Sequence, residues 1–171
     1  MVEKTFSYFA GTPYQLSINL DDQDFLRGDI YKLIKRNVEK YGINPANLIF
    51  EISENISSDQ HQRVIAIIKK IKEMGCLIAI DDFGVDNSNY MRILQLKADY
   101  IKIDGHFIRK IDTHEDSYKV AHSITQFAKN IGVAVVAEYV HSKQVQQVIE
   151  ELGIEYSQGY YWHEPAMKVF S

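Results

Sequence analysis

The sequence alternates short apolar runs with longer segments of helical periodicity, and this alternation restricts the fold more than any other feature. The runs are rich in β-branched and aromatic residues, which favours strands. Most are apolar on both faces, as expected of a sheet covered by helices. Five clear runs lie at residues 16–20, 48–52, 77–80, 100–103 and 133–137, and a weaker one lies at 156–161.

Four segments between these runs place apolar residues at helical spacing and end at a glycine, a common stop signal. The segments are 29–41, a stretch beginning at the capping residue Ser58, 117–131 and 142–152. Strands that alternate with helices predict an α/β fold with parallel strands. The chain has 171 residues and no linker or repeat, so we expect a single domain over residues 1–171.

Composition excludes several classes of protein. The net charge is −4, which gives no electrostatic footprint for nucleic acid or an anionic membrane. No apolar run approaches the ~20 residues needed to span a bilayer, and the first residues do not resemble a secretory signal. The single cysteine, Cys76, cannot form an internal disulfide, which suits a reducing cytoplasm.

Polar residues, most of them acidic, stand at or near the carboxyl end of almost every apolar run. In parallel barrels and open α/β sheets, active sites are built on the edge where these ends meet. A carboxylate buried there is costly unless it is paired or binds a metal. We therefore expect one site from Asn19, Glu51, Asp81, Asp82, Lys102, Asp104, Glu138 and, in the weaker run, Gln158.

Apart from the lysine, the groups at these strand ends offer mainly oxygen ligands, which hard divalent ions such as Mg²⁺ and Mn²⁺ prefer. Two such ions are a known arrangement for in-line hydrolysis of a phosphodiester. A lysine among carboxylates, here Lys102, can orient a water or offset charge that develops on a phosphate. This pattern favours metal-assisted phosphoryl chemistry.

Each residue taken alone also has a plainer interpretation. An Asp-Asp pair such as Asp81-Asp82 often forms a turn or a helix cap, and Glu51 fits a surface residue at a strand end. Lys102 alone is more often the ion-pair partner of a residue such as Asp104. The aromatic residues 160–162 are expected to pack at the end of a barrel rather than stack on a base.

Taken together, the motifs resemble those of the EAL domain family, bacterial phosphodiesterases specific for cyclic di-GMP. The resemblance covers nearly the whole chain in the family's order. It rests on Asn19 for the N-L-S segment, Glu51–Glu54 for E-L-T-E, 81–84 for D-D-F-G, 102–105 for K-I-D-G, 137–140 for A-E-G-V, and 158–160 for Q-G-Y, followed by Pro165.

This resemblance implies a modified TIM barrel of the (β/α)₈ type, here incomplete with about six parallel strands. It implies hydrolysis of one phosphodiester of cyclic di-GMP to linear pGpG with two Mg²⁺ or Mn²⁺ ions. By resemblance, Asn19, Glu51 and Asp81 hold one ion. Asp81 bridges to a second ion, which Asp82 and Glu138 also bind.

The resemblance also assigns roles around the metals. Lys102 positions the attacking water, and Glu138 and Gln158 complete the catalytic set. Glu54 anchors the loop that follows Asp81-Asp82. No residue is assigned to substrate binding.

The chain departs from the family's pattern in three places. The namesake E-A-L segment is absent, so we expect little activity from this chain alone. We also expect self-association, strand exchange or partial disorder near Met1–Gly11. The loop after Asp82 reads Val85-Asp86-Asn87, where the family has a glycine and a tyrosine at its last two positions. Tyr139 replaces a glycine and His141 a glutamate.

Two further functions stay open. An EAL-like domain can act as a cyclic di-GMP receptor or protein-interaction module without turnover. Acidic strand ends with a strand lysine also suit a metal-assisted barrel enzyme that abstracts a proton next to a carboxylate. We expect a homodimer or self-association, and sensory or GGDEF domains in a longer chain.

Overall fold

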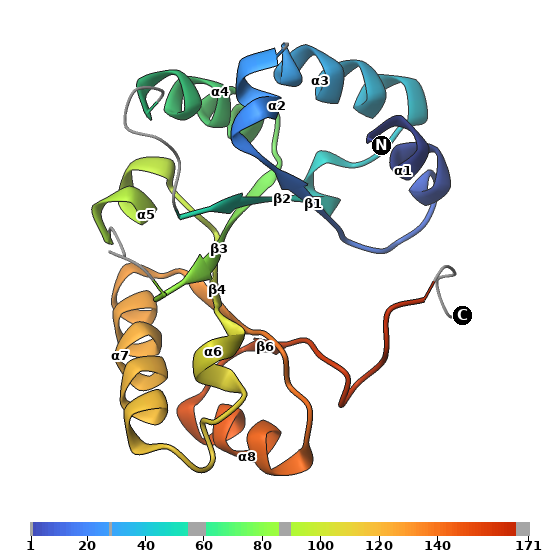
Figure 1. Ribbon diagram of the computed structural model, residues 1–171. Helices are drawn as coiled ribbons and strands as arrows, with labels where there is room; N and C mark the ends of the chain where they lie inside the picture. The colour runs from blue at the N-terminus through green and yellow to red at the C-terminus, as the bar shows by residue number, and fades with distance from the viewer. Residues whose placement is uncertain (1, 28, 55–60, 86–89, 167–171) are drawn as a thin grey trace. The chain divides into compact units, whose positions relative to one another are not determined.

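The computed structural model describes residues 2–27, 29–54, 61–85 and 90–166. The strands form one six-stranded sheet in the order β1-β2-β3-β4-β5-β6, which is the order of the chain. The pairs β1–β2, β4–β5 and β5–β6 are parallel, and helices connect successive strands (Figure 1). The predicted α/β fold with six parallel strands is confirmed, and β1 and β6 are the outer strands of this order.

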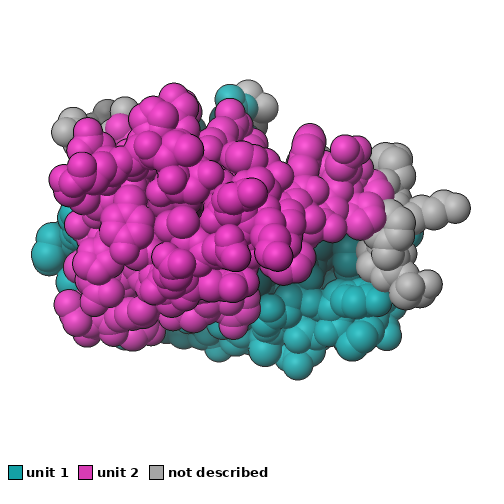
Figure 2. Space-filling view, turned by 90° about the horizontal axis from the view of Figure 1, so that it is seen from below, with its two compact units in different colours: residues 1–80, 89–99 teal, residues 81–88, 100–171 magenta. Residues whose placement is uncertain are grey.

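The chain divides into two compact units, coloured separately in Figure 2. Unit 1 contains residues 1–80 and 89–99, and unit 2 contains residues 81–88 and 100–171. The expectation of one domain over the whole chain stays a prediction.

Unit 1 holds the elements up to the first residues of β3, and α5. In chain order they are α1 (Val2–Phe9), β1 (Leu16–Leu20), α2 (Asp22–Arg27), α3 (Ile30–Tyr41), the 3₁₀ turn η1 (Pro45–Asn47), β2 (Leu48–Ser53), α4 (His61–Glu73), β3 (Leu77–Phe83) and α5 (Tyr90–Leu96). Helix α3 shows the physical basis of its predicted start and end. The Asp29 side chain accepts a hydrogen bond from the Lys32 N–H, and Gly42 closes the helix with φ of 62°.

Unit 2 holds the end of β3 and all later elements. These are β4 (Tyr100–Ile103), α6 (Gly105–Ile108), α7 (Glu115–Ile131), β5 (Ala134–Ala137), α8 (Lys143–Leu152) and β6 (Tyr156–Ser157). Helix α7 lies against β4 and β5. Its Ile124 is buried, as are Ile101 and Val135 of these two strands, and together they contribute to the core of the unit.

Several elements differ from the prediction. The helices α1, α2, α5 and α6 were not expected, because none is longer than eight residues and so shows little periodicity. Of the three alternatives expected near residues 1–11, partial disorder does not fit Val2–Phe9, which is helical and has a fully buried Phe6; self-association and strand exchange stay predictions. Ser58 lies outside the described residues.

Candidate functional site

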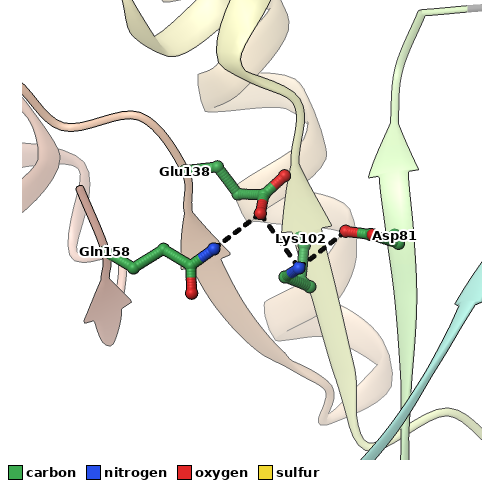
Figure 3. Close-up of polar contacts among 4 residues, drawn as sticks. All are labelled: Asp81, Lys102, Glu138 and Gln158. Atoms are coloured by element: carbon green, nitrogen blue, oxygen red, sulfur yellow. Dashed lines mark hydrogen bonds and ion pairs between the residues drawn. The ribbon is translucent and has the colours of Figure 1, made fainter. Parts of the chain in front are cut away.

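Four polar side chains meet at the carboxyl ends of strands in unit 2 (Figure 3). Lys102 on β4 is at the centre of the cluster. Its Nζ lies 2.7 Å from Asp81 Oδ1 and 2.9 Å from Glu138 Oε1. Gln158 Nε2 donates a hydrogen bond of 2.7 Å to the same oxygen of Glu138. The residues come from β3, from β4, and from the positions that follow β5 and β6, as their placement in the sequence predicts.

The backbone explains why these side chains point to one place. Parallel strands in register bring their carboxyl ends to one edge. The Glu138 N–H donates to the Ile103 carbonyl and the Gln158 N–H donates to the Ala137 carbonyl, so both residues continue the ladder just past the last paired positions. Their side chains are therefore fixed by the sheet itself.

A group of acidic residues in this cluster has the spacing of a metal site. Asp81, Asp82 and Glu138 each offer an oxygen atom, and these atoms lie within 4.8 Å of one another. Asp82 has φ of 54°, a left-handed backbone that Asp tolerates better than most residues and that is common at functional sites. Three carboxylate oxygens fit a hard divalent cation such as Mg²⁺ or Mn²⁺.

The electrostatics of the site favour a cation. Burial raises the pKa of Glu138, and the nearby Lys102 partly opposes this shift. The pKa of Asp82 is also raised, mainly by burial and next by the charge of Asp81. Lys102 forms ion pairs with Asp81 and Glu138, and Asp82 adds a third carboxylate oxygen within 4.8 Å of theirs, so ionised carboxylates outnumber the lysine.

Asp104, at the end of β4, has a different role. It caps α6 by accepting the His106 N–H, and the His106 ring nitrogen Nδ1 also lies 2.6 Å from its carboxylate. Burial alone would raise the pKa of Asp104, but these contacts outweigh it and the pKa is lowered. The side chain of Asp104 also forms a hydrogen bond with Asp82, which contributes to the raised pKa of Asp82.

The remaining predicted ligands lie in unit 1. Asn19 on β1 and Glu51 on β2 are register partners near the carboxyl ends of their strands; Asn19 is exposed and Glu51 is buried. The predicted first-metal set takes residues from both units, so it stays a prediction.

The predicted anchor Glu54 is buried, and the structure gives it a partner that the sequence did not indicate. Arg92 of α5 is also buried and donates from Nη1 to the Glu54 carbonyl oxygen. Burial lowers the pKa of Arg92, although the charges of Asp22 and Glu54 oppose this. The loop positions Asp86 and Asn87 lie outside the described residues, so the anchoring role of Glu54 stays a prediction.

A pocket of about 610 Å³ opens next to Glu138 and Gln158 in unit 2. Residues that were not predicted as site residues line it, chiefly Arg109, Tyr139, His141, Tyr160 and His163. The aromatic residues 160–162 were expected to pack, but Tyr160 is 68% exposed and lines this pocket. The sequence signals near this pocket were the departures at positions 139 and 141 and the segment 158–160 with Pro165.

The model of the EAL domain family matches residues 1–165 of the chain. The chain belongs to the EAL domain family. The chain is 32% identical to the cyclic di-GMP phosphodiesterase PdeF of Escherichia coli (strain K12) over 170 residues, which are 96% of this chain and 23% of that protein. The chain therefore spans about a fifth of the length of the curated relatives that it matches.

Two solved structures have the same fold. The EAL enzyme Bd1971, in a form with cAMP and cyclic di-GMP bound, aligns with a TM-score of 0.84 at 29% identity, over 89% of this chain and 40% of that one. The manganese and cyclic di-GMP complex of BlrP1 from Klebsiella pneumoniae aligns with a TM-score of 0.86 at 23% identity, over 93% of this chain and 42% of that one. The expected relationship to the EAL family is confirmed.

Proposed function

We propose that this domain is a metal-dependent phosphodiesterase that hydrolyses cyclic di-GMP to linear pGpG. The observation that carries the proposal is the cluster of Asp81, Lys102, Glu138 and Gln158, held within hydrogen-bonding distance of one another by consecutive strands. Membership of the EAL family supports the substrate, since relatives of this chain are named for that activity.

The acidic group would hold the catalytic metal. Asp81, Asp82 and Glu138 are the residues that would bind a Mg²⁺ or Mn²⁺ ion, which supplies Lewis-acid stabilisation of charge on the phosphate. By resemblance to the family, Asn19, Glu51 and Asp81 would hold another such ion.

The other side chains orient the reactants. Lys102 is almost completely buried, and its ammonium group has three N–H donors. The Nζ atom lies 2.7 Å from Asp81 Oδ1 and 2.9 Å from Glu138 Oε1, so the ammonium is held in place, and in the proposed reaction Lys102 positions the attacking water. Gln158 donates to Glu138 and fixes the orientation of that carboxylate.

A binding module without turnover is the second candidate. The observation that favours it is the pair of replacements beside Glu138, because Tyr139 and His141 both line the pocket where the family pattern has a glycine and a glutamate. Such a domain would bind cyclic di-GMP as a receptor or dock a partner protein. Self-association and adjoining sensory or GGDEF domains belong to the same proposal.

The test is to incubate this chain and, beside it, a longer protein that contains the E-A-L segment with Mn²⁺ and cyclic di-GMP, and to separate the nucleotides by chromatography. Formation of pGpG that stops on addition of EDTA supports the phosphodiesterase. Binding measured by calorimetry without product supports the receptor. If neither binding nor product is found, the substrate assignment is wrong, and a metal-assisted proton abstraction becomes the better hypothesis.

A further inference from the structure

The residue that follows Glu138 has a strained backbone and a fixed side chain. Tyr139 has φ of 55°, a conformation that is uncommon for a residue other than glycine. Its ring lies where a side chain at position 105 would be, because a Cβ added to Gly105 would overlap the ring. Strain of this kind persists where the surroundings hold it, and it is frequent at ligand sites.

The ring of Tyr139 in turn holds Arg109, which follows α6. The guanidinium carbon of Arg109 lies 4.2 Å from the ring centroid, a cation–π contact. The ring nitrogen Nε2 of His141 lies 3.0 Å from the Arg109 carbonyl oxygen. Two replacements in the loop after β5 thus contact the same arginine, one through its side chain and one through its backbone.

The guanidinium remains available to a ligand. Arg109 is exposed, and among the described ranges, which omit residues 55–60 and 86–89, no carboxylate forms an ion pair with it. A guanidinium that rests on an aromatic ring still presents its N–H donors at its edge. Arg109 is therefore an oriented donor group whose position is set before any ligand arrives.

The pocket that contains this group suits a flat base better than a phosphate. The exposed surface of its lining is mostly apolar, and the exposed rings of Tyr139 and Tyr160 contribute to it beside several charged and polar side chains. Glu164 also lines it, and its negative charge opposes a phosphate. The same pocket reaches Glu138 and Gln158 of the candidate active site.

We propose that Arg109, held by Tyr139, is a specificity-determining residue that recognises a guanine base of the ligand through O6 and N7. This inference rests on the proposed function, since it concerns the substrate of that site. Guanine presents two acceptors at O6 and N7, whereas adenine presents an N–H donor in place of O6. The paired N–H groups of an arginine can donate to O6 and N7 of guanine, whereas the N–H donor of adenine faces them with another donor.

The test compares cyclic di-GMP with cyclic di-AMP as ligands. Binding is measured by calorimetry in a Lys102→Ala background with Mn²⁺, so that turnover does not consume the ligand. Arg109→Lys keeps the charge but loses the fork, and Arg109→Met loses both. Arg63, an exposed residue of α4, gives the matched control Arg63→Met.

We expect both Arg109 variants to bind cyclic di-GMP about tenfold or more weakly, with little change for cyclic di-AMP, and Arg63→Met to bind like the parent. Tyr139→Phe should retain the affinity because the ring remains. Tyr139→Gly should lose affinity while it keeps a cooperative thermal unfolding transition, since glycine accepts the backbone conformation.

Three results would overturn the role of Arg109 but leave the proposed function intact. They are an equal loss of affinity for cyclic di-GMP and cyclic di-AMP in the Arg109 variants, full affinity for cyclic di-GMP in Arg109→Lys, and equal affinity of the parent for the two ligands. A parent protein that binds neither ligand and forms no product would overturn the proposed function, and this inference with it. The two failures are therefore distinguishable.

Discussion

Strand β3 has a lysine–aspartate pair at each end, and the two pairs differ in charge balance. At the amino end, Lys72 Nζ lies 2.5 Å from Asp99 Oδ2, and the Ile78 N–H donates to the same oxygen at 2.8 Å. At the carboxyl end, Lys102 is shared between Asp81 and Glu138, and Asp82 adds a third carboxylate. One end is neutral and the other is negative.

The difference shows how a stabilising pair can be told from a functional cluster. A carboxylate that faces one lysine and one backbone N–H has its charge matched and fastens the helix before β3 to the residue before β4. A lysine outnumbered by carboxylates leaves a surplus of negative charge, which a bound cation or a proton can balance. In α/β proteins the first kind belongs to the amino face and the second to the carboxyl face.

Replacement of the lysine at each end of β3 should give the largest expected difference, which is a difference in kcat. Lys102→Ala is expected to lower the kcat of the proposed hydrolysis at least about a hundredfold while largely sparing cyclic di-GMP binding, because the lysine acts on the attacking water. Lys72→Ala should leave kcat unchanged. Rates with Mn²⁺ at saturating substrate test this, and equal losses in the two variants would remove the distinction between the ends.

Neutralising one aspartate at each end should give the next largest effect. Asp82→Asn keeps a side chain that tolerates the left-handed backbone but removes one charge, so Mn²⁺ affinity should fall about tenfold or more. Asp99→Asn should leave Mn²⁺ affinity unchanged. Titration of free Mn²⁺ by electron paramagnetic resonance measures both, and an equal fall in the two variants would contradict the proposed metal site.

The amino-end pair should matter for stability instead. Lys72→Met leaves the partly buried Asp99 carboxylate without its counter-charge, and we expect the free energy of unfolding to fall by about 1–2 kcal/mol. The exposed pair of Lys32 and Asp29 gives the control Lys32→Met, which should cause no measurable change. Urea denaturation separates these outcomes, and an unchanged midpoint in Lys72→Met would show that the pair is not stabilising.

The smallest expected effect is on the reactivity of a cysteine thiol at each end of β3, which reports how accessible that end is. Burial raises the pKa of Cys76, just before β3, to about 12, so this thiol should not react with a thiol reagent at pH 8 in the native chain. A cysteine introduced as His163→Cys in the pocket should react at once. Mass spectrometry after brief labelling tests this; rapid native labelling of Cys76 would show that the amino end is open.

The same thiol has a linked effect on stability. Its pKa is higher in the folded chain than in the unfolded chain, so between pH of about 9 and 12 the unfolded state releases a proton that the folded state keeps. The contribution of Cys76 to the free energy of unfolding should therefore fall as the pH rises through this window. Cys76→Ala should remove that part of the pH dependence in alkaline denaturation experiments.

The strands and long helices were predictable because their signals are local. The predicted runs 16–20 and 100–103 agree with β1 and β4, and the helix predicted at 142–152 begins one residue later, after its cap Ser142. Helix α6 escaped prediction because it has only four residues and is defined by its Asp104 cap. The weaker run at 156–161 contains only the two-residue strand β6, because Gly159 has φ of 152° and the chain turns away.

One part of the candidate site could be predicted from the sequence, and another part could not. Parallel strands place their carboxyl ends at one edge, so the sequence by itself determined that Asp81, Lys102 and Glu138 would lie near one another. The contact of Arg109 with Tyr139 joins residues 30 positions apart and has no local pattern, so only the tertiary structure decided it.

The same holds for the charge balance that separates the two ends of β3. The sequence distinguishes Lys72, in a helical segment, from Lys102, in an apolar run, but it does not give their partners. Only the folded chain shows that Lys72 pairs with Asp99 and that Lys102 pairs with both Asp81 and Glu138. Residue types and strand ends follow from short-range periodicity, whereas partners and net charge depend on distances of a few ångströms between separate elements.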